Sequence, residues 1–268
     1  MSDLVLRNPP VVEFSMGVQF ARLMQFRTGH LGRFWQYLGT EEWPDATDDL
    51  PIDDQFEQFE TPRWALPPSI PIRISPLQVN RLRMQHKSNE KMIQVQPTRL
   101  HYNWVKSPSQ KPSYSTLSEE FFTVYEQLRG FASSANLGDI QANQWELTYV
   151  NAFAEGEEWT NPADWSNVLP GLFSPLFSDD QSMDMNIDYR NAAWSFEIPS
   201  KLGRVHISAY PGIRPQDDRS SLILTTTARG PVSDGGVDAV REGLNLGHDK
   251  LIKVFLSVVN KTFLEKWR

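Results

Sequence analysis

Alternation of apolar and polar residues predicts strands along much of the chain, and its clearest series runs over residues 79–105. There, Leu82 and Met84 alternate with arginines, and a second alternating run follows a short polar turn. Two alternating runs joined by a turn are typical of an antiparallel hairpin. Pro97 has no N–H to donate to a sheet, so we expect a break there before a third strand at Leu100–Val105.

The same period of two opens each half of the chain. Apolar residues occupy every second position from Val12 to Phe20 and nearly every second position from Trp145 to Phe153. Each run therefore presents one apolar and one polar face. Further strands are expected at Met183–Tyr189, Ala193–Ile198, Arg204–Tyr210 and Leu222–Arg229.

Apolar residues at helical spacing predict helices between these strands and at the end of the chain. Helices are expected at Leu31–Leu38, from Ser118 to Gly138, at Asp164–Leu169 and, after a start that follows Gly236, most clearly at His248–Trp267. The last helix carries a wide apolar stripe that includes Leu251 and Phe255. Such a stripe predicts that this helix packs on the sheet.

These elements predict an α+β fold built on an antiparallel sheet. Each half of the chain, 1–138 and 139–268, has the order strand, short helix, several antiparallel strands and long helix. An offset of 133 residues places Val12 on Trp145 and predicts an internal duplication, with chance recurrence of a common α+β order as the alternative. The order resembles the TATA-binding saddle and also fits a helix-grip fold, and neither resemblance assigns a function.

Composition places the chain among ordinary globular proteins. Hydrophobic residues make up 40% and charged residues 22% of its 268 residues, so global disorder is not expected. Because the chain has no cysteine, disulfides, thiolate metal ligands and cysteine nucleophiles are excluded. No basic stretch followed by an apolar one opens the sequence, and no window of about 18 residues is apolar, so we expect a cytoplasmic protein without a membrane partner.

Charge is distributed unevenly about a net value of −7. Residues 41–60 contain nine acids, no base and few helix or strand signals, whereas nine bases and one acid, Glu90, lie between Arg63 and Lys111. A charge run is usually a solvated surface, so the acidic stretch can be a surface loop that lies near, or merely balances, a basic sheet face. The alternative is that the acidic insert at 41–60 folds over the basic sheet face and competes there with an acidic partner or a nucleic acid. The intact chain then binds nucleic acid little, and replacing 41–60 by a neutral linker increases that affinity.

Sequence motifs for chemistry are missing. The five histidines show no HxH or HExxH spacing, and the chain has no GxGxxG, P-loop or GxSxG motif. We expect His248 to be a cap or the edge of the apolar stripe of its helix instead of a general base. We therefore assign no catalytic residue, no metal ligand and no cofactor, and favour a protein that is not an enzyme.

A candidate binding surface follows from the basic and aromatic residues of the predicted strands. Basic residues there could contact an acidic partner, and aromatic and amide side chains could frame a pocket or a stacking surface, although aromatic residues on strands are usually core. Its members are Arg81, Arg83, Lys87, Lys91, Arg99, Tyr102, Asn103, Trp104, Tyr149 and Asn151.

Several short motifs are spread over nearly the whole chain. They are Asn8-Pro9-Pro10-Val11-Val12-Glu13, Gln94-Val95-Gln96-Pro97 with Asn103-Trp104, Tyr149-Val150-Asn151, and His248 with Phe255. On these residues the chain resembles a sporadically distributed bacterial family of proteins of roughly 250 residues, to which no activity is assigned. The resemblance implies a stand-alone bacterial protein, and the patchy distribution suits mobile or defence-associated loci.

Three functions remain open from the sequence. The first is a non-enzymatic binding protein whose partner is another protein, because strand surface is plentiful and reactive spacing is absent. The second is a saddle that binds nucleic acid through its basic residues, which the net charge of −7 disfavours. The third is a ligand-binding or enzymatic helix-grip protein whose polar residues converge only in the fold. The oligomeric state is not predicted.

Overall fold

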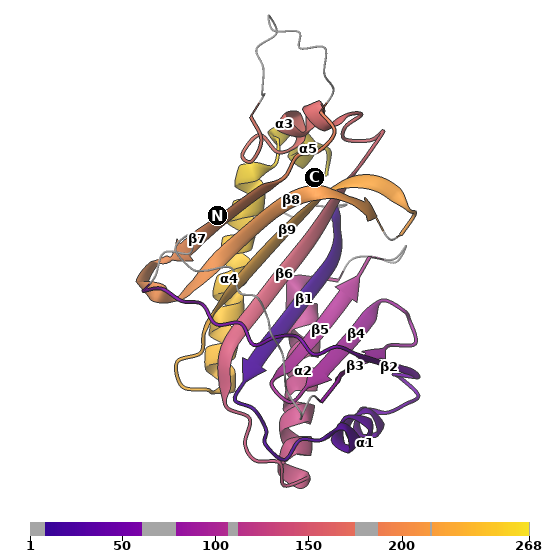
Figure 1. Ribbon diagram of the computed structural model, residues 1–268, viewed down its shortest axis with the longest axis vertical. Coiled ribbons are helices and arrows are strands. Elements are labelled where there is room, and N and C mark those ends of the chain that lie inside the picture. Colours follow the sequence, from indigo (N-terminus) through magenta and orange to yellow (C-terminus); the bar gives the residue numbers. More distant parts are fainter. Residues whose placement is uncertain (1–8, 61–78, 107–111, 175–186, 215, 268) are drawn as a thin grey trace, which may run out of the picture.

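One antiparallel sheet organises residues 9–60, 79–106, 112–174, 187–214 and 216–267, the part of the chain that a computed structural model describes. Its strands are β1 (Val11–Phe20), β2 (Asp45–Asp49), β3 (Arg81–Gln85), β4 (Lys91–Gln96), β5 (Arg99–Val105), β6 (Ala142–Ala154), β7 (Ala192–Ile198), β8 (Gly203–Arg214) and β9 (Arg219–Pro231). The order across the sheet is β2-β3-β4-β5-β1-β6-β9-β8-β7. The predicted α+β class with an antiparallel sheet is confirmed (Figure 1).

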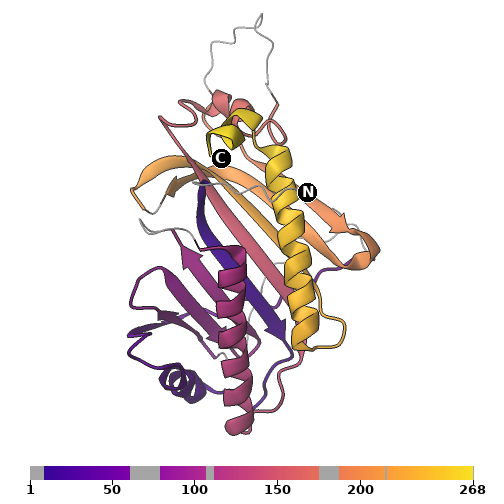
Figure 2. The same cartoon turned by 180° about the vertical axis from the view of Figure 1, so that it is seen from behind.

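Two long helices lie side by side on one face of the sheet (Figure 2). The helices are α1 (Thr28–Leu38), α2 (Tyr114–Ser134), α3 (Trp165–Val168), α4 (Val237–Val258) and α5 (Lys261–Lys266), with short 3-10 turns at Pro162–Asp164 and Pro199–Lys201. The long helices are α2 and α4, so the predicted packing of the C-terminal helix on the sheet is also confirmed. No helix in the described ranges is both long and apolar enough to cross a membrane.

Capping explains where two helices differ from the prediction. Helix α2 begins before Ser118 because the side chain of Ser113 accepts a hydrogen bond of 3.1 Å from the backbone N–H of Thr116. The predicted helix His248–Trp267 is instead two helices. The chain leaves α4 at Val259, and Asn260 caps α5 by accepting a hydrogen bond of 2.9 Å from the N–H of Thr262.

The two halves of the chain contribute strands in the same spatial order. From the centre outward, the first half reads β1-β5-β4-β3 and the second reads β6-β9-β8-β7, and each series is followed by a long helix, α2 or α4. The halves meet where β1 pairs with β6, with Ser15 opposite Thr148 near the middle of the pair. This order agrees with the predicted duplication, which stays a prediction. The predicted boundary at 138 and 139 falls between α2 and β6.

Two predictions about strands are corrected. Residues 187–189 of the predicted strand Met183–Tyr189 are not in a strand, and residues 183–186 lie outside the described ranges. The acidic insert does contain a strand, because β2 pairs with β3 at the edge of the sheet. Aspartates have low strand propensity, but Asp49 lies beside two arginines of β3, and these ion pairs offset that preference.

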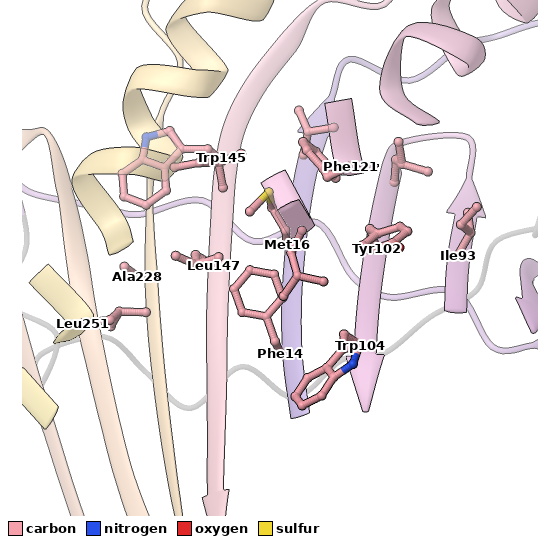
Figure 3. Packing of buried hydrophobic residues seen from close by; sticks show 14 of the residues in the cluster. Phe14, Met16, Ile93, Tyr102, Trp104, Phe121, Trp145, Leu147, Ala228 and Leu251 are labelled. Carbon is pink, nitrogen blue, oxygen red and sulfur yellow. The ribbon is translucent and has the colours of Figure 1, made fainter. Parts of the chain in front are cut away.

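Glycines let α4 approach the sheet closely over the indole of Trp145 (Figure 3). A Cβ atom added to Gly243 would lie 2.2 Å from Trp145 Cδ1, and one added to Gly247 would lie 2.8 Å from Trp145 Cζ3. On the strand side, Gly230 of β9 is similarly close, at 2.7 Å from Trp145 Cζ2. The absence of side chains at these three positions thus creates the space that the largest residue of β6 fills.

We predict that Gly243→Ala lowers the free energy of unfolding by about 1–3 kcal/mol, because the added methyl overpacks the contact with Trp145. The matched control is Gly32→Ala in α1, whose added Cβ meets nothing within 4 Å. The control should gain up to about 1 kcal/mol from helix propensity. Urea denaturation of both variants measures the difference, and equal midpoints would contradict this packing.

We also predict that Phe255→Ala lowers the free energy of unfolding by about 3–5 kcal/mol, as expected for loss of a buried aromatic ring. Phe255 is 8% exposed and faces the core, whereas Ile252 on the same helix is 39% exposed. Ile252→Ala should therefore cost about 1 kcal/mol or less. Denaturation midpoints of the two variants test this, and an unchanged midpoint for Phe255→Ala would show that its face is not core.

Candidate functional site

The ten predicted surface residues lie on both faces of the sheet, so they do not form one surface. Successive residues of a strand point to opposite faces, and the predicted set mixes the two parities. Arg81, Arg83, Arg99 and Asn103 lie on the face opposite α2 and α4, which we call the polar face. Lys91, Tyr102, Trp104, Tyr149 and Asn151 lie on the helix-covered face, and Lys87 lies in the turn between β3 and β4.

Most of these residues already have partners within the chain. Lys91 Nζ and the Tyr102 hydroxyl both bind the carboxylate of Glu120 on α2, at 2.6 and 2.5 Å. Tyr149 bonds His248 at 2.9 Å, and the imidazole of His248 stacks on Tyr114, which ties α4 to β6 and α2. His248 lies inside α4, so it is not a helix cap, and it contacts the aromatic residues that pack beside that helix. These aromatic residues serve the core.

Acids of the insert neutralise the basic residues of β3 and its turn. Asp49 lies 2.7 Å from Arg81 and 3.2 Å from Arg83, and Glu42 lies 2.6 Å from Lys87. The bases Arg63, Arg73 and Lys111 lie outside the described residues. The acidic insert therefore lies against part of the predicted basic block, which agrees with both interpretations of the charge pattern.

Beyond β2, residues 50–60 form a segment that we call the strap. In Figure 1 this dark segment leaves β2 and crosses in front of the sheet toward the turn between β7 and β8. Along the way it contacts Gln96 of β4, Gln19 of β1, Gln144 of β6 and Arg204 of β8. The strap thus spans the polar face from the first half of the chain to the second.

Side chains of the sheet hold the backbone of the strap. Gln96 accepts a hydrogen bond of 2.9 Å from the N–H of Ile52 and donates one of 2.8 Å to its carbonyl. Gln144 makes the same double contact with the carbonyl of Gln55 and the N–H of Glu57. Gln19 accepts from the N–H of Gln55. Two amide groups therefore bind the strap as a neighbouring strand would, but through side chains.

Arginines complete this backbone contact. Arg99 donates to the carbonyl of Asp53 at 3.0 Å, and Arg204 donates to the carbonyl of Gln58 at 2.9 Å. The three glutamines and Arg99 are each only 3% exposed, so the strap satisfies polar groups that are shielded from water. Within the described ranges, the backbone of the strap makes hydrogen bonds to side chains and none to another backbone group.

One acid of the strap, Glu57, enters a cluster of basic side chains. His206 Nε2 lies 2.6 Å from Glu57 Oε1, and Arg204 Nε donates to Oε2 at 3.0 Å. Arg229 Nε lies 3.4 Å from Glu57 and 3.2 Å from Glu146, in ion-pair contact with both but without an aligned hydrogen bond. The side chain of Glu57 is 9% exposed. Burial alone would raise the pKa of Glu57, but the hydrogen bond from His206 and the charges of His206, Arg229 and Arg204 together lower it.

The register of the sheet explains why an acid is needed at this place. Arg204 of β8 lies directly opposite Arg229 of β9, and like charges in opposing positions destabilise a pair of strands. Glu57 lies between the two guanidinium groups and offsets their repulsion. Our prediction from the sequence missed both arginines because each is isolated in its strand. Their juxtaposition appears only once the β8–β9 register is known.

Polar amides on strand faces were visible in the sequence, but their role was not. Gln19, Gln96 and Gln144 occupy polar positions of alternating strands, which normally predicts exposure to water. The sequence feature that these three glutamines share is their position at or close to a strand end. Even so, the partner of each lies 36 to 89 residues away in the sequence.

Another buried polar residue, His101, lies beside the strap contacts. It sits opposite Gly17, where an added Cβ would come within 2.5 Å of the imidazole, so glycine makes room for the ring. Its Nε2 atom lies 3.9 Å from Glu146 and makes no hydrogen bond. Burial lowers the pKa of His101 to about 4 despite the opposing charge of Glu146. The ring is therefore neutral near pH 7.

Comparisons with known proteins add no assignment. No known family matches the chain, and no curated protein is similar to it. The resemblance seen in the short sequence motifs therefore stays an expectation. Within the described ranges, no group of three or more histidine, aspartate and glutamate side chains has a geometry that could hold a metal ion.

We predict that His101 makes stability depend on pH. Its pKa is lowered from the model-peptide value of 6.5 to about 4, so the unfolded chain binds a proton more readily than the folded chain. Stability is then complete above pH 6.5 and falls as pH drops toward 4, with a slope of up to about 1.4 kcal/mol per pH unit.

His101→Gln removes this titrating group, and its free energy of unfolding should change less between pH 6.5 and 5 than that of the natural chain. Urea denaturation at several pH values measures both slopes. The other histidines are common to both proteins, so the difference isolates His101. Parallel curves would show that the ring is solvated.

Proposed function

We propose that this chain is a non-enzymatic binding protein whose polar face binds an extended segment of another protein. The observation that carries the proposal is the way in which the sheet holds the strap. Seven backbone groups of the strap, from Ile52 to Gln58, bond to side chains of the sheet. Contacts to backbone groups can be made with any extended chain, so the arrangement suits peptide recognition.

Several side chains of the strap contribute little to its attachment. Leu50 and Phe56 are 74% and 59% exposed, whereas the side chains of Gln55 and Glu57 contact arginines of the sheet. A partner segment of different sequence can therefore make the same backbone contacts. Because the strap is tethered, it competes with a partner segment at an effective concentration of the order of millimolar. A partner must bind tightly enough to overcome this competition.

Nucleic acid is the second candidate, and one observation favours it. Arg99, Arg204 and Arg229 lie on the polar face in contact with the strap, while Arg81 and Arg83 lie nearby against Asp49. Displacement of the strap would remove Glu57 from this set and leave an excess of positive charge. Phosphate contacts could then form, with steep salt dependence.

Two wider assignments belong to the same proposal. The shared strand order of the two halves supports an internal duplication, with β1 and β6 in equivalent places. The short motifs that resemble a bacterial family support a cytoplasmic protein of a mobile or defence-associated locus. Neither assignment is needed for binding at the polar face.

We predict that replacing residues 50–60 by a glycine–serine linker of equal length exposes the binding face. A fluorescent peptide with the sequence of residues 50–60 should then bind at least about tenfold more tightly than it binds the intact chain, because the tethered competitor is gone. Fluorescence anisotropy measures both affinities. The replacement leaves β2 and the buried Trp43 in place, unlike a replacement of 41–60.

The matched control adds Gln144→Ala to the linker protein, which removes two backbone contacts and should weaken peptide binding. Circular dichroism establishes that both proteins are folded. A folded linker protein that binds no peptide would contradict the proposed function. If it instead binds duplex or single-stranded DNA, with affinity falling steeply in a salt titration, the nucleic-acid alternative replaces it.

A further inference from the structure

We infer that Arg204, His206 and Arg229 form a carboxylate subsite, so that the partner segment carries an acidic side chain where the strap carries Glu57. The strap is then an internal competitor that imitates the partner. This inference rests on the proposed function and explains how a partner is recognised. Backbone contacts hold the segment, and the three basic side chains favour a segment with an acidic residue at this position.

The cluster is better explained by recognition than by stability. The side chains of Glu57, Arg204, His206 and Arg229 are 9%, 12%, 17% and 18% exposed. Burial of ion pairs in this way costs desolvation energy that roughly offsets their attraction, so an apolar cluster would stabilise the fold as well. Charged groups held in fixed geometry do, however, discriminate strongly between an acid and a neutral side chain.

The cluster also remains reachable from the side of the sheet that the strap leaves open. An open groove on the polar face of β7, β8 and β9 is lined by Arg204, His206 and Arg229 together with hydroxyl side chains. These hydroxyls belong to Ser195, Ser208, Thr225 and Thr227. An incoming carboxylate can therefore approach the arginines along this groove before Glu57 has left.

Spacing along the strap defines the segment that fits. Gln96 binds the backbone at Ile52, and Gln144 binds it at Gln55 and Glu57. The three basic side chains bind the carboxylate of Glu57. The partner segment is accordingly extended, with an acidic residue five positions after the residue bound by Gln96. Glu60 differs from Glu57, because its side chain is 85% exposed and its ion-pair partner in the described part of the chain is the exposed Lys201.

The test compares three peptides on the linker protein that lacks the strap. One has the sequence of residues 50–60, the second carries Glu57→Gln, and the third carries Glu60→Gln as the matched control. Fluorescence anisotropy should show at least a tenfold weaker affinity for Glu57→Gln and less than a twofold change for Glu60→Gln. Arg204→Met in the linker protein should reduce the difference between the first two peptides, because it removes one of the three side chains that contact the carboxylate.

The outcomes separate this inference from the function on which it rests. If the three peptides bind equally, the carboxylate subsite is wrong and peptide binding stands. If none binds to the folded protein, the proposed function fails. Preferential competition by an oligonucleotide over the acidic peptide would assign the cluster to phosphate instead.

A second measurement applies should the linker protein not fold. In the full chain, Glu57→Gln should speed hydrogen exchange at the backbone amides of residues 52–57 and let the peptide of residues 50–60 bind in trans more tightly than to the natural chain. Glu60→Gln should leave both unchanged. Equal exchange and equal peptide affinity in the two variants would overturn the inference.

Discussion

The pairing of β1 with β6 is the contact on which the rest of the molecule depends. It joins the two halves into one sheet and brings Gln19 of the first half beside Gln144 of the second. The same pairing aligns α2 and α4 on one face, where they bury the apolar residues of both halves. The opposite face then carries polar side chains from both halves, which neither half could bring together alone.

A polar face of this kind needs a partner for its shielded groups. Beneath the strap the amides of Gln19, Gln96 and Gln144 are shielded from water, and a shielded amide without a hydrogen bond costs about 1–3 kcal/mol. The arginines opposite each other on β8 and β9 need a negative charge. The strap meets both needs with one stretch of chain, and any segment that replaces it must do the same.

How much of the fold and of the site could be predicted depends on how far apart in the sequence the residues that determine each feature lie. Local alternation predicted the strands β1 and β3 to β9, since each strand carries its own pattern. It did not predict β2, whose aspartates are stabilised by Arg81 and Arg83 of another strand. The site was harder still, because Glu57 and Arg204 are 147 residues apart and nothing in either neighbourhood indicates the other.

The strap covers only one end of the polar face, and this asymmetry bears on how a partner could displace a tethered competitor. Its contacts lie at Gln19 and Gln144, whereas Val12, Ala152 and Ile223 form a separate apolar cluster toward the other ends of these strands. At about 3.3 Å per residue, the two regions are roughly 25 Å apart. Those three residues are only 3–6% exposed, so they offer a partner little apolar surface. A partner must therefore displace the strap at the strap's own contacts.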